Sequence, residues 1–459
     1  MLFSSLEFIF LFLPLFLFAY YLAPLRFKNF ILFISGVLFY AFGEIRLLPI
    51  FLLTILIDFS FGLLISRFRE KLILARLLLI LAIIFNLSLL VYFKYFDFFR
   101  SSLLGLEPLG ILLPIGISFY TFQALSYVID VYRGEVFATK NIINFGAYIA
   151  LFPQLIAGPI VKYSDIERQL SSRSISFTLI SSGLRRFICG LSKKVLLANA
   201  SGELFEFFCD SNSYLGALLV VFFFGMQIYF DFSGYSDMAV GLGRMLGFEF
   251  VENFNYPYIS LSISDFWRRW HISLSSFFKE YVYIPLGGSR RSKLRTALNI
   301  VIVWALTGLW HGASYNFLLW GVYFAVLLIV EKLLLKRFIS SAPRFFLRIY
   351  SLFFIFLGWL IFASDGVTLG ARNGLSVFSR LFFISPTAFA EGYELLIFLG
   401  SLPFIFLLVL GSTSIPKRVY VYLTERTSFA SVILPLGALA LSVSYIVSSG
   451  YNPFLYFRF

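Results

Sequence analysis

Long apolar runs are the feature of this sequence that most restricts its fold. Runs of membrane-spanning length recur along the chain, among them residues 8–24, 72–93, 111–130, 214–232, 296–310, 314–330, 349–363, 394–410 and 430–448. A helix of roughly 20 residues crosses the hydrocarbon core of a bilayer. Hydrophobic residues make up 60% of the 459 residues and charged residues only 13%, whereas about a quarter of the residues in soluble proteins are charged. We therefore expect an integral membrane protein embedded in the lipid bilayer.

The length of these runs predicts an all-α, polytopic fold. Strands of a membrane barrel give shorter segments in which polar and apolar residues alternate, whereas these runs are continuously apolar. We estimate about 11 transmembrane helices. The stretches between them are too short for a separate soluble core, which favours a single membrane domain over residues 1–459. The N-terminal segment carries Glu7 and lacks a basic leader, so we expect a retained helix rather than a signal peptide.

Basic side chains give the chain a net charge of +13 and gather between the apolar runs. The sequence contains no recognisable base-reading module, so we expect no nucleic-acid partner. Cytoplasmic loops of membrane proteins carry an excess of Lys and Arg. This rule places the loop with Arg67 and Arg69, and the basic region 255–298, in the cytoplasm. The N-terminus is then expected on the extracytoplasmic side.

One of the two histidines, His311, lies in the apolar stretch LTGLWHGASYNF. The residues after it, 312–314, predict a break between two helices. Ionisable groups inside a membrane are costly and usually line an enclosed cavity where they act. A neutral imidazole there can serve as a general base. A structural histidine, bonded to Asn316 or Ser314, is an equally open interpretation.

The second histidine, His271, follows an aromatic and basic pattern within ISDFWRRWHISLSSFFKEYVYIPLGGSRRSK. Aromatic residues at three- and four-residue spacings predict one amphipathic, interfacial or re-entrant helix, with Ser264 or Asp265 as its N-cap. The Gly-Gly turn that follows, with Arg290 and Arg291, predicts a cradle for phosphate built from backbone N–H groups and guanidinium groups. The alternative is a basic loop that anchors to lipid headgroups.

Further polar residues interrupt the apolar segment 224–248, including Gln227, Asp231 and Asp237. Six residues separate the two aspartates, so they point to different faces of a continuous helix. One can orient a histidine and the other pair with Arg244, although structural ion pairing is as good an interpretation. Together with polar residues in 113–134 and 151–163, they suggest a central polar tunnel. No metal site is expected, because the two histidines lie forty residues apart with no cysteine nearby.

Several long motifs resemble the membrane-bound O-acyltransferase family, and within it the bacterial branch of alginate O-acetyltransferases. They are LPIGISFYTFQALSYVIDVYRG, FPQLIAGPIVKY, QIYFDFSGYSDMAVGLGRMLGF, ENFNYPY, SDFWRRWHISLSSFFKEYVYIPLGGSR and LTGLWHGASYNFLLWG. The motifs fall in order within residues 110–330, which the resemblance implies to be the catalytic core.

The resemblance implies a ring of helices around a tunnel in the bacterial cytoplasmic (inner) membrane. His311 matches the histidine regarded as catalytic, and His271 matches one with a secondary role. The implied donor is a cytoplasmic acyl thioester such as acetyl-CoA, with no tightly bound cofactor. The implied acceptor is an extracytoplasmic polysaccharide, alginate or another exopolysaccharide or cell-wall polymer, modified with the help of an SGNH-type acetyltransferase partner.

On this hypothesis His311 is the base toward an acceptor hydroxyl, and Trp310 and Asn316 are candidate donors to the oxyanion. Four basic residues, Arg268, Arg269, Arg290 and Arg291, are candidates for holding the phosphates of the donor or an acidic acyl carrier protein. Two alternatives remain: a D-alanyl transferase of the same family that is fed by a carrier protein, and a lipid or sugar transporter that performs no chemistry.

Overall fold

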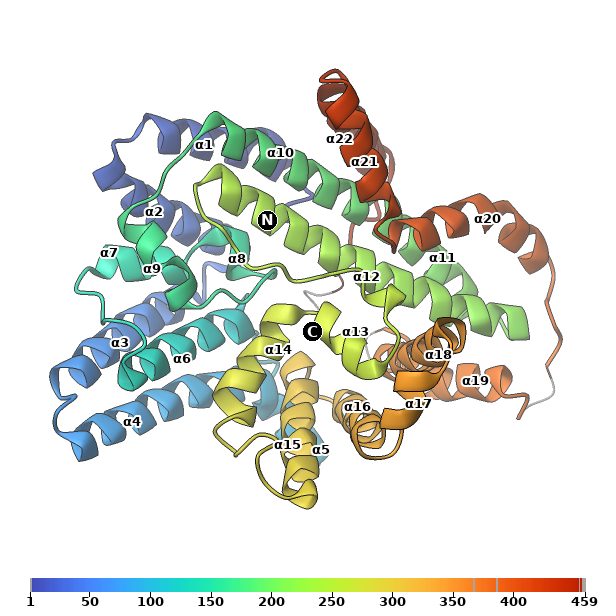
Figure 1. The fold of residues 1–459 in the computed structure, drawn as a ribbon, viewed down its shortest axis with the longest axis horizontal. Coiled ribbons are helices and arrows are strands. Elements are labelled where there is room, and N and C mark those ends of the chain that lie inside the picture. Colours follow the sequence, from blue (N-terminus) through green and yellow to red (C-terminus); the bar gives the residue numbers. More distant parts are fainter. Residues whose placement is uncertain (1, 366–367, 385–386, 454, 456–459) are drawn as a thin grey trace. The chain divides into compact units, whose positions relative to one another are not determined.

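The computed structural model of this chain describes residues 2–365, 368–384, 387–453 and 455, and over these residues its regular secondary structure is entirely helical (Figure 1). The all-α prediction is therefore confirmed. By internal contacts the chain divides into two compact units. The first comprises residues 1–187 with 235–251, and the second comprises residues 188–234 with 252–459.

The first unit contains most of the N-terminal helices. They are η1 (Phe8–Phe12), α1 (Leu13–Leu22), α2 (Leu25–Glu44), α3 (Leu48–Arg67), α4 (Leu72–Leu90), η2 (Val91–Tyr95), α5 (Phe96–Ser102), α6 (Ile117–Arg133), α7 (Ile142–Ile149), α8 (Phe152–Leu155), α9 (Tyr163–Ser171) and most of α10 (Phe177–Ser192). Helices α3, α4 and α6 pack against one another, and α2 packs against α7.

The second unit contains the remaining elements. They are η3 (Lys193–Asn199), α11 (Ala200–Cys209), most of α12 (Tyr214–Met245), η4 (Pro257–Ile259), α13 (Ile263–Arg269), α14 (Ile272–Phe278), η5 (Lys279–Tyr283), α15 (Lys293–His311), α16 (Tyr315–Leu333), α17 (Lys336–Ser341), α18 (Arg344–Ala363), α19 (Ala371–Leu381), α20 (Glu394–Gly411), α21 (Ile415–Arg426) and α22 (Ala430–Ser448).

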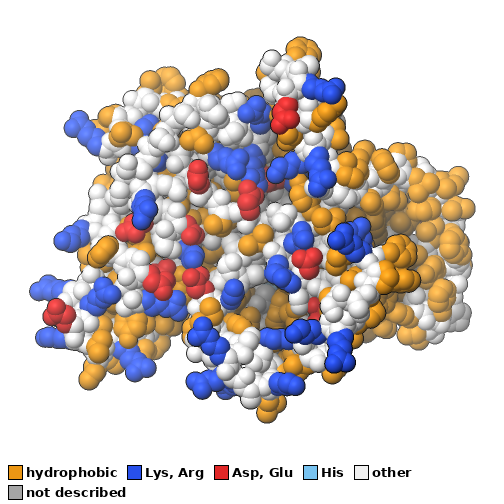
Figure 2. Space-filling view, in the orientation of Figure 1, with side chains coloured by type: hydrophobic (Ala, Val, Ile, Leu, Met, Phe, Trp, Pro, Cys, Tyr) orange, Lys and Arg blue, Asp and Glu red, His pale blue; other side chains and the backbone are white. Residues whose placement is uncertain are grey.

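Eight helices among the described residues are long and apolar enough to cross a membrane. They are Leu25–Glu44, Leu48–Arg67, Leu72–Ser102, Tyr214–Met245, Tyr315–Leu333, Arg344–Ala363, Glu394–Gly411 and Ala430–Ser448. Many of their large apolar side chains are exposed, as expected of lipid-facing surfaces, and Figure 2 shows such side chains gathered over the part of the second unit that includes α20. The chain is a multi-pass membrane protein.

The sequence estimate of about 11 spans is higher because three predicted spans form helices that fall outside this set. The run 8–24 forms the shorter apolar helix Phe8–Leu22. The run 111–130 forms α6 only from Ile117 onward, over 17 residues. The run 296–310 lies within α15, which carries two basic residues, Lys293 and Arg295, in its first turn and is less apolar.

Helices α15 and α16 cross at glycines, and this crossing positions His311. A Cβ atom at Gly308 would collide with the backbone carbonyl of Phe317, and one at Gly321 would collide with that of Trp304. Only glycine allows two helix backbones to approach this closely. Helix α15 ends at His311, Gly312 is extended with φ −174°, and α16 begins at Tyr315. The helix break predicted after His311 is confirmed.

We expect Gly321→Ala to lower the stability of the protein by about 1–3 kcal/mol, since the added methyl group meets a fixed backbone carbonyl rather than a movable side chain. The unfolding midpoint in nanodiscs measures this. Gly437→Ala in α22 is the matched control, because nothing lies within 4 Å of a Cβ atom at that position. Equal midpoints for the two variants would show that the crossing tolerates a side chain.

Candidate active site

His311 lies at the end of α15 in an aromatic enclosure. Its side chain is almost fully buried, with 4% of the residue exposed. The rings of Trp320 and Phe362 meet the imidazole edge to face, at centroid distances of 5.1 and 5.3 Å. The ring of Trp310 lies 5.1 Å away. The predicted burial of His311 is thus confirmed, and its surroundings are mainly apolar.

His271 belongs to the same unit and lies at a break between two short helices. The single amphipathic helix predicted here is wrong: α13 ends at Arg269 and α14 begins at Ile272. His271 between them has φ 43°, in the left-handed region. The predicted N-cap is also wrong, because the hydroxyl of Ser262 accepts from the N–H of Asp265 at 3.0 Å and caps α13.

Trp310 connects the two histidines. Its ring lies 5.8 Å from that of His271 and 5.1 Å from that of His311. Burial lowers the pKa of His271 well below its usual range, and the nearby His311 lowers it further. His271 is therefore neutral at physiological pH. The structure brings together three of the predicted site residues, two imidazoles and one indole.

Tryptophans anchor α13 to the neighbouring helices. Trp267 lies 4.5 Å from Trp304 of α15 and 5.5 Å from Trp320 of α16, measured between ring centroids. Trp270 lies 4.7 Å from Trp359 of α18. Burial of such large rings is among the strongest apolar contributions to packing. The aromatic stripe predicted from the sequence is the face by which α13 is held against the helices around His311.

Glu331 is a site residue that the sequence analysis missed. Its buried carboxylate, near the end of α16, accepts from the N–H groups of Ile263 and Ser264 at 2.6 and 2.8 Å. It also accepts from the hydroxyl of Tyr350 at 3.3 Å. Glu331 therefore caps α13 from a different helix. The sequence offered one signal for this role, because Glu331 is an acidic residue near the end of an apolar run.

Asn316, a predicted donor to the oxyanion, lies in the first turn of α16, and its side-chain amide donates to the carbonyl of Ser364. This bond links the start of α16 to the end of α18, whose last residue is Ala363. One amide N–H of Asn316 is therefore used in the folded structure.

Asp231 and Gln227 are predicted to bind substrate, but their side chains contact other residues of the chain. Asp231 forms an ion pair of 3.0 Å with Lys194 and accepts from the N–H of Leu455 at 2.8 Å. The side-chain amide of Gln227 contacts the hydroxyl of Tyr451 at 3.5 Å. Ion pairing, one of the two interpretations offered for Asp231, is what the structure shows.

Lys194 is also held by the segment that contains Tyr451 and Pro453. Its ammonium donates to Asn199 Oδ1 at 2.6 Å and to the carbonyl of Pro453, and the amide of Asn199 donates to the carbonyl of Tyr451 at 3.1 Å. Burial lowers the pKa of Lys194, and the Asp231 carboxylate opposes that effect. Asp231 and Lys194 are each only 2% exposed, so their charges depend on these partners.

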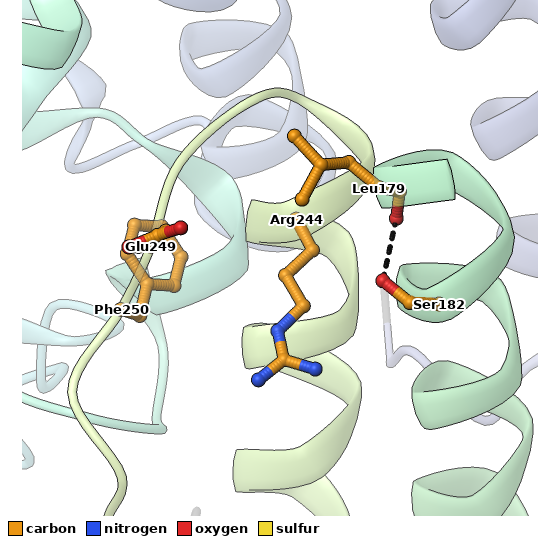
Figure 3. Close-up of a pocket in the computed structure, with 5 residues that line it drawn as sticks. All are labelled: Leu179, Ser182, Arg244, Glu249 and Phe250. Carbon is orange, nitrogen blue, oxygen red and sulfur yellow. Dashed lines mark hydrogen bonds between the residues drawn. The ribbon is translucent and has the colours of Figure 1, made fainter. Parts of the chain in front are cut away.

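Asp237 belongs to the other unit. Its carboxylate binds Arg186 of α10 at 2.7 Å, a cation that the sequence did not single out. Arg244 lines a surface hollow of about 330 Å³ with Leu179, Ser182, Glu249 and Phe250. Figure 3 shows its guanidinium between the loop that carries Glu249 and the helix that carries Ser182. This hollow contains none of the predicted site residues.

The four predicted donor-binding arginines differ in their surroundings. Arg268, Arg290 and Arg291 are exposed, whereas Arg269 is half-buried. Arg269 binds Asp265 at 3.0 Å and donates to the carbonyl of Asn255 at 3.3 Å. Arg269 therefore supports the position of α13, and the other three guanidinium groups face outward.

The Gly-Gly turn is confirmed, since Gly287 and Gly288 have φ 102° and 56°. Three backbone N–H groups of the predicted phosphate cradle are already used within the turn. The N–H groups of Gly287, Gly288 and Arg290 donate to the carbonyls of Ile284, Tyr283 and Gly287, at 2.9 to 3.2 Å. Donors used inside the turn cannot also bind an anion. Any phosphate contact here falls to the exposed arginine side chains.

The described residues contain no group of three or more His, Cys, Asp or Glu side chains that could hold a metal ion. The chain is thus a multi-pass helical membrane protein with two buried histidines and a basic surface loop. The profile of MBOAT, the membrane-bound O-acyltransferase family, matches residues 37–371, beyond both ends of the motif region 110–330. This chain belongs to that family and is an O-acyltransferase.

Curated relatives carry related names. A "Probable alginate O-acetylase AlgI" of Azotobacter vinelandii is 42% identical over 83% of this chain and 78% of its own length. A "Peptidoglycan O-acetyltransferase" of Helicobacter pylori is 34% identical over 80% of this chain and 78% of its own length. A more distant "Teichoic acid D-alanyltransferase" of Bacillus subtilis is 30% identical over 48% of this chain and 59% of its own length.

We expect Asp231→Ala to destabilise the fold by about 3–5 kcal/mol, because it leaves the buried Lys194 ammonium without its carboxylate. The yield of folded protein and its unfolding midpoint measure this loss. The double variant Lys194→Leu with Asp231→Leu is the control, since it removes both charges and is expected to recover most of the stability. A stable Asp231→Ala variant would return this residue to the list of substrate-binding candidates.

Proposed function

We propose that this chain transfers an acetyl group from a cytoplasmic thioester, acetyl-CoA, to a hydroxyl group of an extracytoplasmic polysaccharide. The buried His311 at the break between α15 and α16 is the observation that carries the proposal. The names of the relatives, which act in alginate and peptidoglycan O-acetylation, support an acetyl donor and a polysaccharide acceptor.

The chemistry assigned to His311 is general base catalysis. The imidazole takes the proton of the acceptor hydroxyl as its oxygen attacks the thioester carbonyl carbon. The resulting oxyanion is stabilised by N–H donors, for which Trp310 and the remaining amide N–H of Asn316 are the candidates. The C–S bond then breaks, and the leaving thiolate receives the proton held by His311. The products are the O-acetyl ester and the free thiol.

The aromatic enclosure of His311 suits this role. Packing by Trp320 and Phe362 limits access of bulk water, which would otherwise hydrolyse the thioester. The exposed Arg268, Arg290 and Arg291 supply guanidinium groups for the phosphates of the donor. We assign His271, neutral and close to Trp310, a supporting role in the same site.

The remaining parts of the proposal concern the surroundings of the protein. The donor enters from the cytoplasm through a tunnel in a single membrane domain over residues 1–459, in the bacterial inner membrane, with the N-terminus outside. An SGNH-type partner outside the membrane completes transfer to the polymer. The excess of basic residues in 255–298 supports a cytoplasmic position for that region.

D-alanyl transfer fed by an acyl carrier protein is a second candidate, and the more distant Bacillus subtilis relative favours it. The exposed arginines are equally suited to an acidic carrier protein. Membership of an acyltransferase family argues against the transporter alternative.

We expect His311→Ala to lower acetyl transfer by about 10²–10⁴-fold, the range attributed to a general base. Purified protein in nanodiscs is supplied with radiolabelled acetyl-CoA, a candidate polysaccharide and an SGNH-type partner, and label on the polymer is counted. Gly437→Ala is the control for expression, purification and reconstitution of a variant, because nothing lies within 4 Å of a Cβ atom at that position.

Full transfer by a folded His311→Ala protein contradicts the assigned role. If the wild type transfers no label from acetyl-CoA but does so from an acylated carrier protein, the carrier-fed alternative replaces the acetyl-CoA proposal.

A further inference from the structure

We propose that Asn253 is a positioning residue that fixes the tautomer of His271, so that Nδ1 carries the proton and Nε2 carries the lone pair turned to the reaction. Asn253 lies in ENFNYPY, a motif to which the proposed function gives no task. The inference rests on the proposed function only in placing His271 at the active site. The tautomer itself follows from hydrogen-bond geometry.

The side-chain oxygen of Asn253 is identified by its partners. It receives the backbone N–H of Ser273 at 3.3 Å and the hydroxyl of the same residue at 2.9 Å. A backbone N–H can only donate, so the amide atom that faces it must be the oxygen. This settles the orientation of the Asn253 amide, which is otherwise ambiguous between its oxygen and nitrogen.

The same oxygen lies 3.1 Å from Nδ1 of His271. Two acceptors cannot form a hydrogen bond, so Nδ1 must carry the proton. In a neutral imidazole the other nitrogen, Nε2, then holds the lone pair. Asn253 and His271 are each 1% exposed, and water therefore cannot easily replace this acceptor if it is lost.

The backbone around Asn253 holds the histidine in its unusual conformation. The carbonyl of Asn253 accepts from the N–H of Ile272 at 3.0 Å, and the N–H of Asn255 donates to the carbonyl of Arg269 at 2.9 Å. These bonds join residues 253–255 to both sides of the left-handed turn at His271, where φ is 43°. A non-glycine residue pays a conformational cost there, which surrounding bonds must offset. Asn253 thus fixes both the backbone and the ring.

A lone pair on Nε2 gives His271 a defined task. It can accept a hydrogen bond from a hydroxyl or from a protonated group but cannot donate one at that nitrogen while neutral. His271 is therefore suited to orient the acceptor hydroxyl, whereas it is unsuited to donate to an oxyanion through Nε2. In comparable sites, the partner of the second ring nitrogen decides which chemistry the first can perform.

The chain contains only two histidines, which makes the tautomer directly measurable. In a His311→Ala background, protein made with ¹⁵N-labelled histidine gives the ring signals of His271 alone by solid-state NMR in nanodiscs. We expect a protonated Nδ1 and a bare Nε2. A protonated Nε2 in that protein would overturn the proposal.

Three variants separate positioning from general support of the fold. Asn253→Leu removes the acceptor, and we expect it to shift His271 toward the Nε2-protonated form. Asn253→Asp keeps an acceptor oxygen and is expected to keep Nδ1 protonated. Ser273→Ala keeps the backbone N–H that identifies the oxygen and is expected to retain the tautomer as well. An unchanged tautomer in folded Asn253→Leu contradicts the proposal.

Acetyl transfer gives an independent readout in protein that retains His311. We expect Asn253→Leu to lower acetyl transfer at least about tenfold, mainly through kcat, with partial rescue by Asn253→Asp. The NMR result does not depend on turnover, so failure of the proposed function leaves the tautomer assignment testable on its own. A correct tautomer without any acetyl transfer would overturn only the function.

Discussion

Gly308 and Gly321 bring the backbones of α15 and α16 together with no side chain between them, and the surroundings of both histidines follow from that approach. It sets the end of α15 at His311 and directs Trp320 of α16 against the imidazole. In a bilayer, apolar side chains gain little by leaving lipid for protein, so close backbone contact and van der Waals packing must supply much of the attraction between helices.

Polar groups in the second unit are satisfied by the chain rather than by solvent. Glu331 binds the first N–H groups of α13, Asn253 binds the turn at His271, and Asp231 binds Lys194. Each is a buried group whose loss of a partner costs more than the bond itself contributes. The free-energy cost of burying an unpaired polar group therefore also fixes the geometry around the candidate site.

The sequence was sufficient for the helical class, for most spans and for the break after His311, because apolar length and a Gly-containing interruption are local signals. It was insufficient at His271, where one helix was predicted and two occur. The cause is a contact with residues 253–255 that no periodicity reports. The partners of charged residues were harder to predict, because Lys194, the partner of Asp231, lies on a different helical element. The hydrogen bonds of the Gly-Gly turn were also not predictable, because its backbone N–H groups donate to carbonyls within the turn. Roles that depend on distant partners require the folded structure.

The contacts of Pro453 and Leu455 also have a consequence for biosynthesis. Leu455 donates to Asp231 across 224 residues of sequence, and the carbonyl of Pro453 receives Lys194. A ribosome delivers α10, η3 and α12 to the membrane long before it makes these partners. During that interval Lys194 and Asp231 have each other and Asn199 as partners, but lack the contacts from Pro453 and Leu455. The last contacts to this ion pair can therefore form only after the segments that carry its two charges have been made.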